Sequence, residues 1–157
     1  VGVSSNSHEA IKNLLSEIEK QSTKEKFSFK GMKKSNTTNL FEGKFIKDII
    51  KEKPVDIGDY SLFAGTAWFF SNVRMNQTLD YLFIDEAGQV SLANTISMAT
   101  STKNLVLIGD QMQLSQPIKG THEGYAKLSA LDYILEGRDT IPPEQGIFLR
   151  ETRRLIQ

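Results

Sequence analysis

The chain has 157 residues, of which 39% are hydrophobic and 24% are charged, and its 19 basic side chains balance its 19 acidic ones. This length and composition are typical of one soluble globular domain with its own core. A net charge of zero excludes a general attraction to nucleic acid, so such binding would have to come from a local patch. The absence of cysteine excludes disulfides, zinc–thiolate sites and thiol catalysis. It also fits a reducing compartment, so we expect a cytoplasmic protein.

The two ends of the chain and its apolar stretches bear on its cellular setting. The longest apolar stretch, residues 60–70, is too short to cross a bilayer, and no signal peptide opens the chain. The sequence starts at Val1 rather than at a methionine and stops at Gln157. We therefore expect a fragment of a longer protein that has no membrane partner.

The first expected elements are a short strand that ends near Val3 and an amphipathic helix that runs to about Lys20. Asn6 is a typical helix N-cap, and Glu9, three residues later, is a typical acid of the first turn. Apolar residues then follow at the i, i+3, i+4, i+7 spacing of one helix face, namely Ile11, Leu14, Leu15 and Ile18.

Residues 20–56 or so are expected to form a basic insertion of loop and helix. Six lysines face one glutamate between Lys20 and Lys34. A short helix is expected at residues 45–51, before Pro54. The lysines could follow the phosphates of a nucleic acid, and a solvated surface loop is the alternative.

The rest of the chain alternates strands with helices. The expected strands are short and almost wholly apolar, as parallel strands covered on both faces are; they are residues 60–64, 81–84, 105–108 and 147–149. Helices are expected at residues 92–99 and 127–136, the second ended by Gly137. This order predicts an α/β fold with a mainly parallel sheet and helices on both faces.

Two of these strands end in acid, one at Asp85-Glu86 and one at Gly109-Asp110. In an open parallel sheet, ligands bind at the carboxyl ends of the strands. There Asp85 could hold a largely hydrated Mg²⁺ that neutralises phosphate, and Glu86 could orient or deprotonate a water molecule. The amide of Gln113 could touch a terminal phosphate oxygen. The ordinary alternative is a helix cap beside a solvated acid, since short motifs often match by chance.

Several segments together resemble superfamily 1 helicases. "FIDEAGQ" is similar to motif II (Walker B) and "GDQMQLSQP" to motif III, most closely in the branch that moves 5′ to 3′, the group of the nonsense-mediated-decay helicase and its bacterial relatives. In the family's order, "VGVSSNSHEAI" resembles motif Ia, "FAGTAWFF" motif Ic and "FLRETRRL" motif IV. The resemblance covers nearly the whole chain apart from the lysine-rich insertion. It implies a partial first RecA-like domain of the P-loop NTPase class, residues 1–157, that uses ATP and Mg²⁺.

The resemblance also implies roles for the acids and amides. Asp85 would bind Mg²⁺, Glu86 would activate water and Gln113 would sense the γ-phosphate of ATP. Asp110 would position the motif III loop, with direct contact to metal or water left open. Gln89 would contact the nucleotide or a partner domain.

Motif IV would add a positive charge. Arg154 matches the arginine that approaches the γ-phosphate in such helicases and stabilises developing charge there. Arg153 stands where relatives often carry an aromatic residue, so the choice between the two arginines stays open. Ile156-Gln157 replaces the family's His-Pro, which weakens the match at this end.

Motifs Ia and Ic imply contacts with a single nucleic-acid strand. Ser5 and Asn6 match the backbone-contacting positions of motif Ia, at a helix N-terminus that suits phosphate; the alternative is that Asn6 only caps its own helix. Gly65 and Thr66 are the comparable residues of motif Ic. Trp68 could stack on a base, but the run from Trp68 to Phe70 is apolar enough that core packing is favoured.

The family's P-loop, G-x-x-x-x-G-K-[S/T], is absent from the sequence, and so is the second RecA-like domain, an expected partner. We therefore expect negligible ATPase activity from the isolated chain. In RecA-like sheets the P-loop strand lies beside the motif III strand. Without it, residues 105–108 would present an open edge, or residues 147–149 would pair there instead.

The parent protein is thus expected to be an ATP-hydrolysing helicase that translocates on single-stranded nucleic acid and unwinds duplexes. DNA is favoured over RNA because the nearest likeness is bacterial, and a fused RecB-type nuclease domain, which some relatives carry, is left open. One alternative is a non-catalytic nucleic-acid-binding or regulatory module with a degenerate ATPase site. A less favoured one is another P-loop phosphotransferase, against which the motif Ia, Ic and III segments argue.

Overall fold

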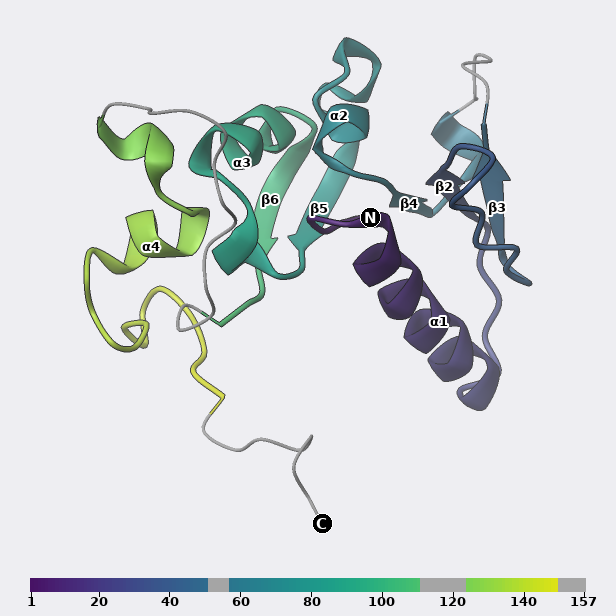
Figure 1. The fold of residues 1–157 in the computed structure, drawn as a ribbon. Helices are drawn as coiled ribbons and strands as arrows, with labels where there is room; N and C mark the ends of the chain where they lie inside the picture. Colours follow the sequence, from purple (N-terminus) through teal and green to yellow (C-terminus); the bar gives the residue numbers. More distant parts are fainter. Residues whose placement is uncertain (51–56, 111–123, 150–157) are drawn as a thin grey trace.

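The computed structural model describes residues 1–50, 57–110 and 124–149. In these residues six parallel strands form one sheet of order β3-β2-β4-β1-β5-β6, with helices packed on both faces (Figure 1). The strands are β1 (Gly2–Ser4), β2 (Gly31–Lys34), β3 (Ile46–Ile49), β4 (Leu62–Ala64), β5 (Leu79–Ile84) and β6 (Thr102–Leu107). The α-helices are α1 (His8–Lys24), α2 (Ala67–Phe70), α3 (Leu92–Ala99) and α4 (Ala130–Leu135). Short 3₁₀ turns are η1 (Ile57–Asp59), η2 (Val73–Met75), η3 (Ala87–Gln89) and η4 (Gly124–Lys127).

The predicted α/β fold with a parallel sheet is confirmed at this level. The strands expected at residues 60–64, 81–84 and 105–108 overlap β4, β5 and β6, although β4 starts at Leu62 and β6 ends at Leu107; the helix expected at residues 92–99 is α3. The helix expected at residues 127–136 is shorter, because α4 begins only at Ala130, after its N-cap Ser129. It ends at Leu135, where the backbone turns left-handed at Glu136 and Gly137.

Each face of the sheet buries its own core. On one face α1 packs against the sheet through Ile11 and Leu15, neither of which has exposed surface. On the other face the helices that follow β4, β5 and β6 cover a larger cluster, which includes Phe63, Phe70, Leu82, Ile84, Met98 and Leu131. This double coverage suits the continuous apolar runs at Leu62–Ala64 in β4 and at residues 82–84 in β5, whereas β2 and β3 also carry lysine and aspartate.

The basic segment forms part of the sheet, and the helix expected at residues 45–51 is wrong. α1 continues to Lys24, and the chain then adds β2 and β3, which pair in parallel. Ile46 belongs to the core under α1, whereas Ile49 packs against the opposite core. The spacing of these two residues suits one helix face. In a strand, the same spacing sends them to opposite faces, and both faces are covered here.

The strand expected at residues 147–149 is also wrong. The structure assigns them no regular structure, and they lie on a segment that leads away from the body of the sheet (Figure 1). Their side chains are 87%, 55% and 81% exposed, because no neighbouring strand pairs with them. Among the described strands β6 therefore pairs with β5 alone. Of the two outcomes expected for residues 105–108, an open edge or pairing with residues 147–149, the structure shows the open edge. Within the described ranges there is also no helix with the length and hydropathy that a bilayer crossing requires.

Candidate functional site

The carboxyl ends of β1 and β5 lie side by side in the middle of the sheet, where an open α/β sheet has its ligand-binding crevice. These two strands are neighbours, and the N–H of Asp85 donates to the carbonyl of Ser4 at 2.9 Å. The chain leaves β1 into α1 on one face and leaves β5 toward α3 on the other. Connections that depart to opposite faces mark a topological switch point, and open α/β sheets bind ligands at such points.

The acidic residues after β5 lie at this switch point. Asp85 and Glu86 are both partly buried, and neither carboxylate bonds to another described side chain. Glu86 has left-handed backbone angles, φ 54° and ψ 39°, at the turn into η3. This conformation costs a residue with a side chain about 1–2 kcal/mol. Because the backbone leaves the extended conformation at Glu86, the two neighbouring acids can serve different ligands.

The turn after β6 packs directly against the turn after β5. The N–H of Ala87 donates to the carbonyl of Ile108 at 2.9 Å. A Cβ added to Gly88 would lie 2.7 Å from the carbonyl oxygen of Asp110, and one added to Gly109 would lie 2.9 Å from the nitrogen of Ala87. Only glycine permits this backbone contact, which places Asp110 on the same rim as the β5 acids.

A magnesium ion would meet few protein ligands here. Over the described ranges, no three His, Cys, Asp or Glu side chains lie close enough to form a metal cluster. Mg²⁺ bound to a nucleotide commonly takes one or two carboxylates and otherwise water and phosphate oxygens. Asp85 alone at the end of β5 fits that requirement.

Gln113, Arg153 and Arg154 lie outside the described residues. Their predicted contacts with the γ-phosphate therefore stay predictions.

Asn6 connects the end of β1 to the turn after β5. Ser7, and not Asn6, caps α1, since its hydroxyl accepts the N–H of Ala10 at 3.1 Å. The prediction that Asn6 is the cap is therefore wrong. Its amide is directed to the other side of the crevice and donates to the side-chain oxygen of Gln89 at 3.4 Å. The sequence patterns had placed these two residues in separate sites.

Unpartnered polar atoms gather where β1 meets α1. The hydroxyls of Ser4 and Ser5 and Nδ1 of His8 are buried and have no hydrogen-bond partner among the described residues. Each such atom costs about 1–3 kcal/mol. Burial, and then the charges of Lys33 and Lys12, lower the pKa of His8, which favours its neutral form. Sequence reasoning missed Ser4 and His8, because nothing in their spacing predicts burial.

The end of β4 lies against the end of β1. The N–H of Gly65 donates to the carbonyl of Val3 at 3.3 Å. Thr66 is the N-cap residue of α2, but its half-exposed side chain makes no capping hydrogen bond. The four residues predicted to contact nucleic acid, Ser5, Asn6, Gly65 and Thr66, are thus brought together.

Core packing, the role favoured for residues 68–70, holds for Phe70 but is wrong for Trp68. Phe70 has no exposed surface, whereas 90% of Trp68 is exposed. A four-residue helix presents only one face to the sheet, so the two residues cannot both be buried.

Several lysines of the basic segment have structural partners. Lys33 is completely buried, and its ammonium group donates to the hydroxyl of Ser35 at 2.6 Å and to the carbonyl of Asn39 at 2.7 Å. Lys30 forms an ion pair with Asp59 at 3.2 Å. The alternative of a solvated surface loop is therefore wrong for Lys33, which is buried within the fold.

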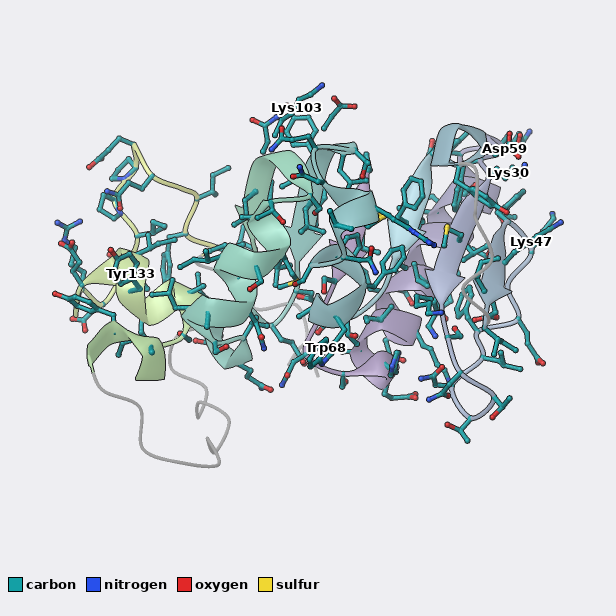
Figure 2. The ribbon with its side chains drawn as sticks, turned by 90° about the horizontal axis from the view of Figure 1, so that it is seen from above. Lys30, Lys47, Asp59, Trp68, Lys103 and Tyr133 are labelled. Atoms are coloured by element: carbon teal, nitrogen blue, oxygen red, sulfur yellow. The ribbon has the colours of Figure 1, made fainter. Side chains whose placement is uncertain are left out.

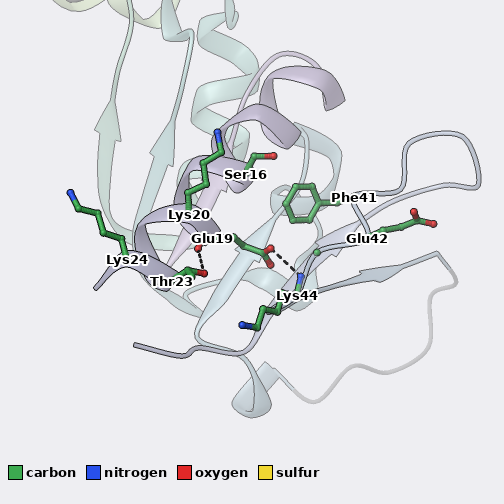
Figure 3. Close-up of a pocket in the computed structure, with 9 residues that line it drawn as sticks. Ser16, Glu19, Lys20, Thr23, Lys24, Phe41, Glu42 and Lys44 are labelled. Carbon is green, nitrogen blue, oxygen red and sulfur yellow. Dashed lines mark hydrogen bonds between the residues drawn. The ribbon is translucent and has the colours of Figure 1, made fainter. Parts of the chain in front are cut away.

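A separate groove of about 640 Å³ lies between α1 and residues 41–44 (Figure 3). In it the carboxylate of Glu19 accepts the N–H groups of Lys44, Phe45 and Ile46 at 2.7–3.2 Å. Because Ile46 is the first residue of β3 and Phe45 precedes it, the groove lies at the amino end of this strand. It is thus at the other edge of the sheet from the acids, and its central carboxylate already has partners.

No protein-family model matches the sequence, and comparison with curated proteins finds no significant match.

Proposed function

We propose that this chain is part of the first RecA-like domain of an ATP-driven helicase of the superfamily 1 type, which moves along single-stranded nucleic acid. The observation that carries the proposal is the group of polar residues that meet at the carboxyl ends of β1, β5 and β6. There Asp85, Glu86 and Asp110 share one rim, and the Asn6–Gln89 hydrogen bond joins that rim to the end of β1. Such a bond is a short physical path between a nucleotide site and a nucleic-acid site.

The acids have distinct roles in this proposal. Asp85 holds the Mg²⁺ that neutralises the phosphates of ATP, and Glu86 orients and deprotonates the attacking water. Asp110 shapes the neighbouring turn, from which Gln113 reaches the γ-phosphate. Arg154 adds positive charge to the same phosphate in the transition state, where such charge is most effective.

The phosphate cradle has to come from another segment, because the sequence has no G-x-x-x-x-G-K-[S/T] pattern. The open edge of β6 offers a place for the strand that carries it. Apolar side chains on this side of the sheet are exposed, namely Tyr81 at 46%, Leu105 at 36% and Ile108 at 47%. An added strand with its helix would cover them and would satisfy the free backbone groups of β6.

On the nucleic-acid side, Ser5, Asn6, Gly65 and Thr66 bind the backbone of one strand. The first N–H groups of α1 point toward the same region, where a phosphate is favoured by the helix dipole. The unpartnered hydroxyls of Ser4 and Ser5 support a ligand at this place. Contacts of this kind do not separate DNA from RNA, and DNA is our preference from the resemblance alone.

A Glu86→Gln substitution tests the catalytic part of the proposal. It is best measured in a protein that carries this chain together with an intact P-loop. The variant should bind ATP with unchanged affinity and should lose ATP hydrolysis, because an amide cannot accept the proton of the attacking water. Glu136→Gln is a matched control, since Glu136 is another acid in left-handed backbone, φ 49°, but it is exposed and lies after α4. Unchanged hydrolysis by Glu86→Gln would favour the alternative, a binding module without catalysis.

A further inference from the structure

One large aromatic side chain stands exposed on a turn that is otherwise anchored in the core. Trp68 is 90% exposed, whereas Phe70 of the same helix is completely buried. The rings of Phe69 and Phe70 meet edge to face at 5.0 Å. Phe69 also packs so closely on Gly65 that an added Cβ there would lie 2.7 Å from its ring. These contacts fix the backbone of α2, so Trp68 is held outward by a rigid support.

Trp68 lies at the carboxyl edge of the sheet, next to the residues proposed to hold a nucleic-acid backbone. β4 and β1 pair in parallel, and Val3 stands opposite Ala64. Two residues further along each strand are Ser5 and Thr66, and Trp68 follows within one helical turn. Figure 2 shows Trp68 on the opposite side of the molecule from Lys103, which lies near the amino end of β6.

The indole ring supplies what the neighbouring polar groups lack. Hydroxyl, amide and backbone N–H groups bind phosphate and sugar, which positions a strand. The bases of a single strand are unpaired, and each has an apolar face that stacks on an exposed aromatic ring. A ring on a fixed backbone loses little conformational entropy when a base covers it.

We propose that Trp68 is a base-stacking platform, on which one unpaired nucleobase rests while Asn6 and Thr66 hold the adjoining backbone. This inference rests on the proposed function and adds a base contact to that interface. An apolar surface of another protein domain is the competing occupant, and it would cover Trp68 whether or not bases are present.

The chain contains a single tryptophan, so its intrinsic fluorescence reports on Trp68 alone. The test is a titration with a labelled single-stranded oligothymidylate and with a strand of equal length that has abasic sites in place of bases. Tryptophan emission should be quenched by the first strand and little changed by the second. Trp68→Ala should weaken binding of the base-bearing strand by about 5- to 150-fold, and Trp68→Phe should weaken it less. Neither substitution should change the affinity for the abasic strand.

Val73→Ala is the matched control, because Val73 is also an exposed apolar residue, at 83%, but lies in η2. It should leave the affinity unchanged, and Trp68→Ala should keep the wild-type melting temperature. If the wild-type protein binds the oligothymidylate without quenching, and Trp68→Ala binds it equally well, base stacking is excluded and the proposed function survives. If the label shows no binding of either strand, the proposed nucleic-acid site itself is contradicted, and the stacking proposal with it.

Discussion

Removal of the Asp48 carboxylate should strongly destabilise the protein. This side chain is 10% exposed and lies on β3, where it accepts the N–H groups of Phe41 and Glu42 at 2.9 Å each and the hydroxyl of Ser35. The ammonium group of Lys33, which has no exposed surface, lies 3.9 Å away. Asp48→Ala would therefore free two backbone donors and leave a buried positive charge without its counter-ion.

The magnitude follows from these contacts. Removal of one partner of a buried ion pair lowers the free energy of unfolding by about 3–5 kcal/mol. For a chain of this size, each kcal/mol changes the melting temperature by about 2–4 °C, so Asp48→Ala should lower it by about 6–20 °C.

The same carboxylate predicts a pH dependence. Burial raises the pKa of Asp48, but the hydrogen bonds from Glu42, Ser35 and Phe41, together with the charge of Lys33, outweigh burial and bring it below the ordinary value of 3.8. The folded state thus holds this proton less tightly than the unfolded state. The stabilisation is fully present above pH 3.8 and is lost as the pH falls below that value toward the folded pKa. Asp48→Ala should lack this portion of the acid dependence.

Circular dichroism melts over a range of pH measure both effects. Asp80→Ala is the control, since Asp80 pairs with Lys103 at 2.7 Å but both side chains are mostly exposed. Its melting temperature should stay close to the wild-type value. An unchanged melting temperature for Asp48→Ala would refute the reasoning, and it would mean that residues 31–49 are not packed into the sheet.

Two further substitutions test the local geometry around the crevice. Gly109→Ala should cost about 1–3 kcal/mol, because its Cβ would press on the nitrogen of Ala87, and urea unfolding measures the change. Gly146→Ala is its control, since the nearest atoms to a Cβ there belong to the side chain of Ile141 and not to backbone; equal effects would contradict the contact between the two turns. Ser7→Ala should cost about 1 kcal/mol through the lost cap of α1, as thermal melts should show. A larger loss for Asn6→Ala would instead make Asn6 the capping residue.

The fold class and the strands that carry the acids were predictable from the sequence. Apolar runs without alternation belong to strands covered on both faces, and this pattern located β4, β5 and β6. The abrupt change from Ile84 to Asp85 predicted the position of the crevice, because carboxyl ends of parallel strands share an edge.

The rest depends on contacts between distant residues. A sequence with six lysines in fifteen positions predicts a solvated loop, and nothing local shows that Lys33 is buried by partners at Ser35, Asn39 and Asp48. Trp68 is exposed because Phe70 of the same short helix is the residue that packs into the core. The direction of the Asn6 side chain depends on Gln89, which lies 83 positions later.

The most direct test of the central claim is a crystal structure of a protein that carries this chain with an intact P-loop, bound to Mg²⁺ and a non-hydrolysable ATP analogue. We predict that the metal lies within one water molecule of Asp85, with Glu86 facing the γ-phosphate and a strand paired to the open edge of β6. A nucleotide bound away from the carboxyl ends of β1, β5 and β6 would contradict the account.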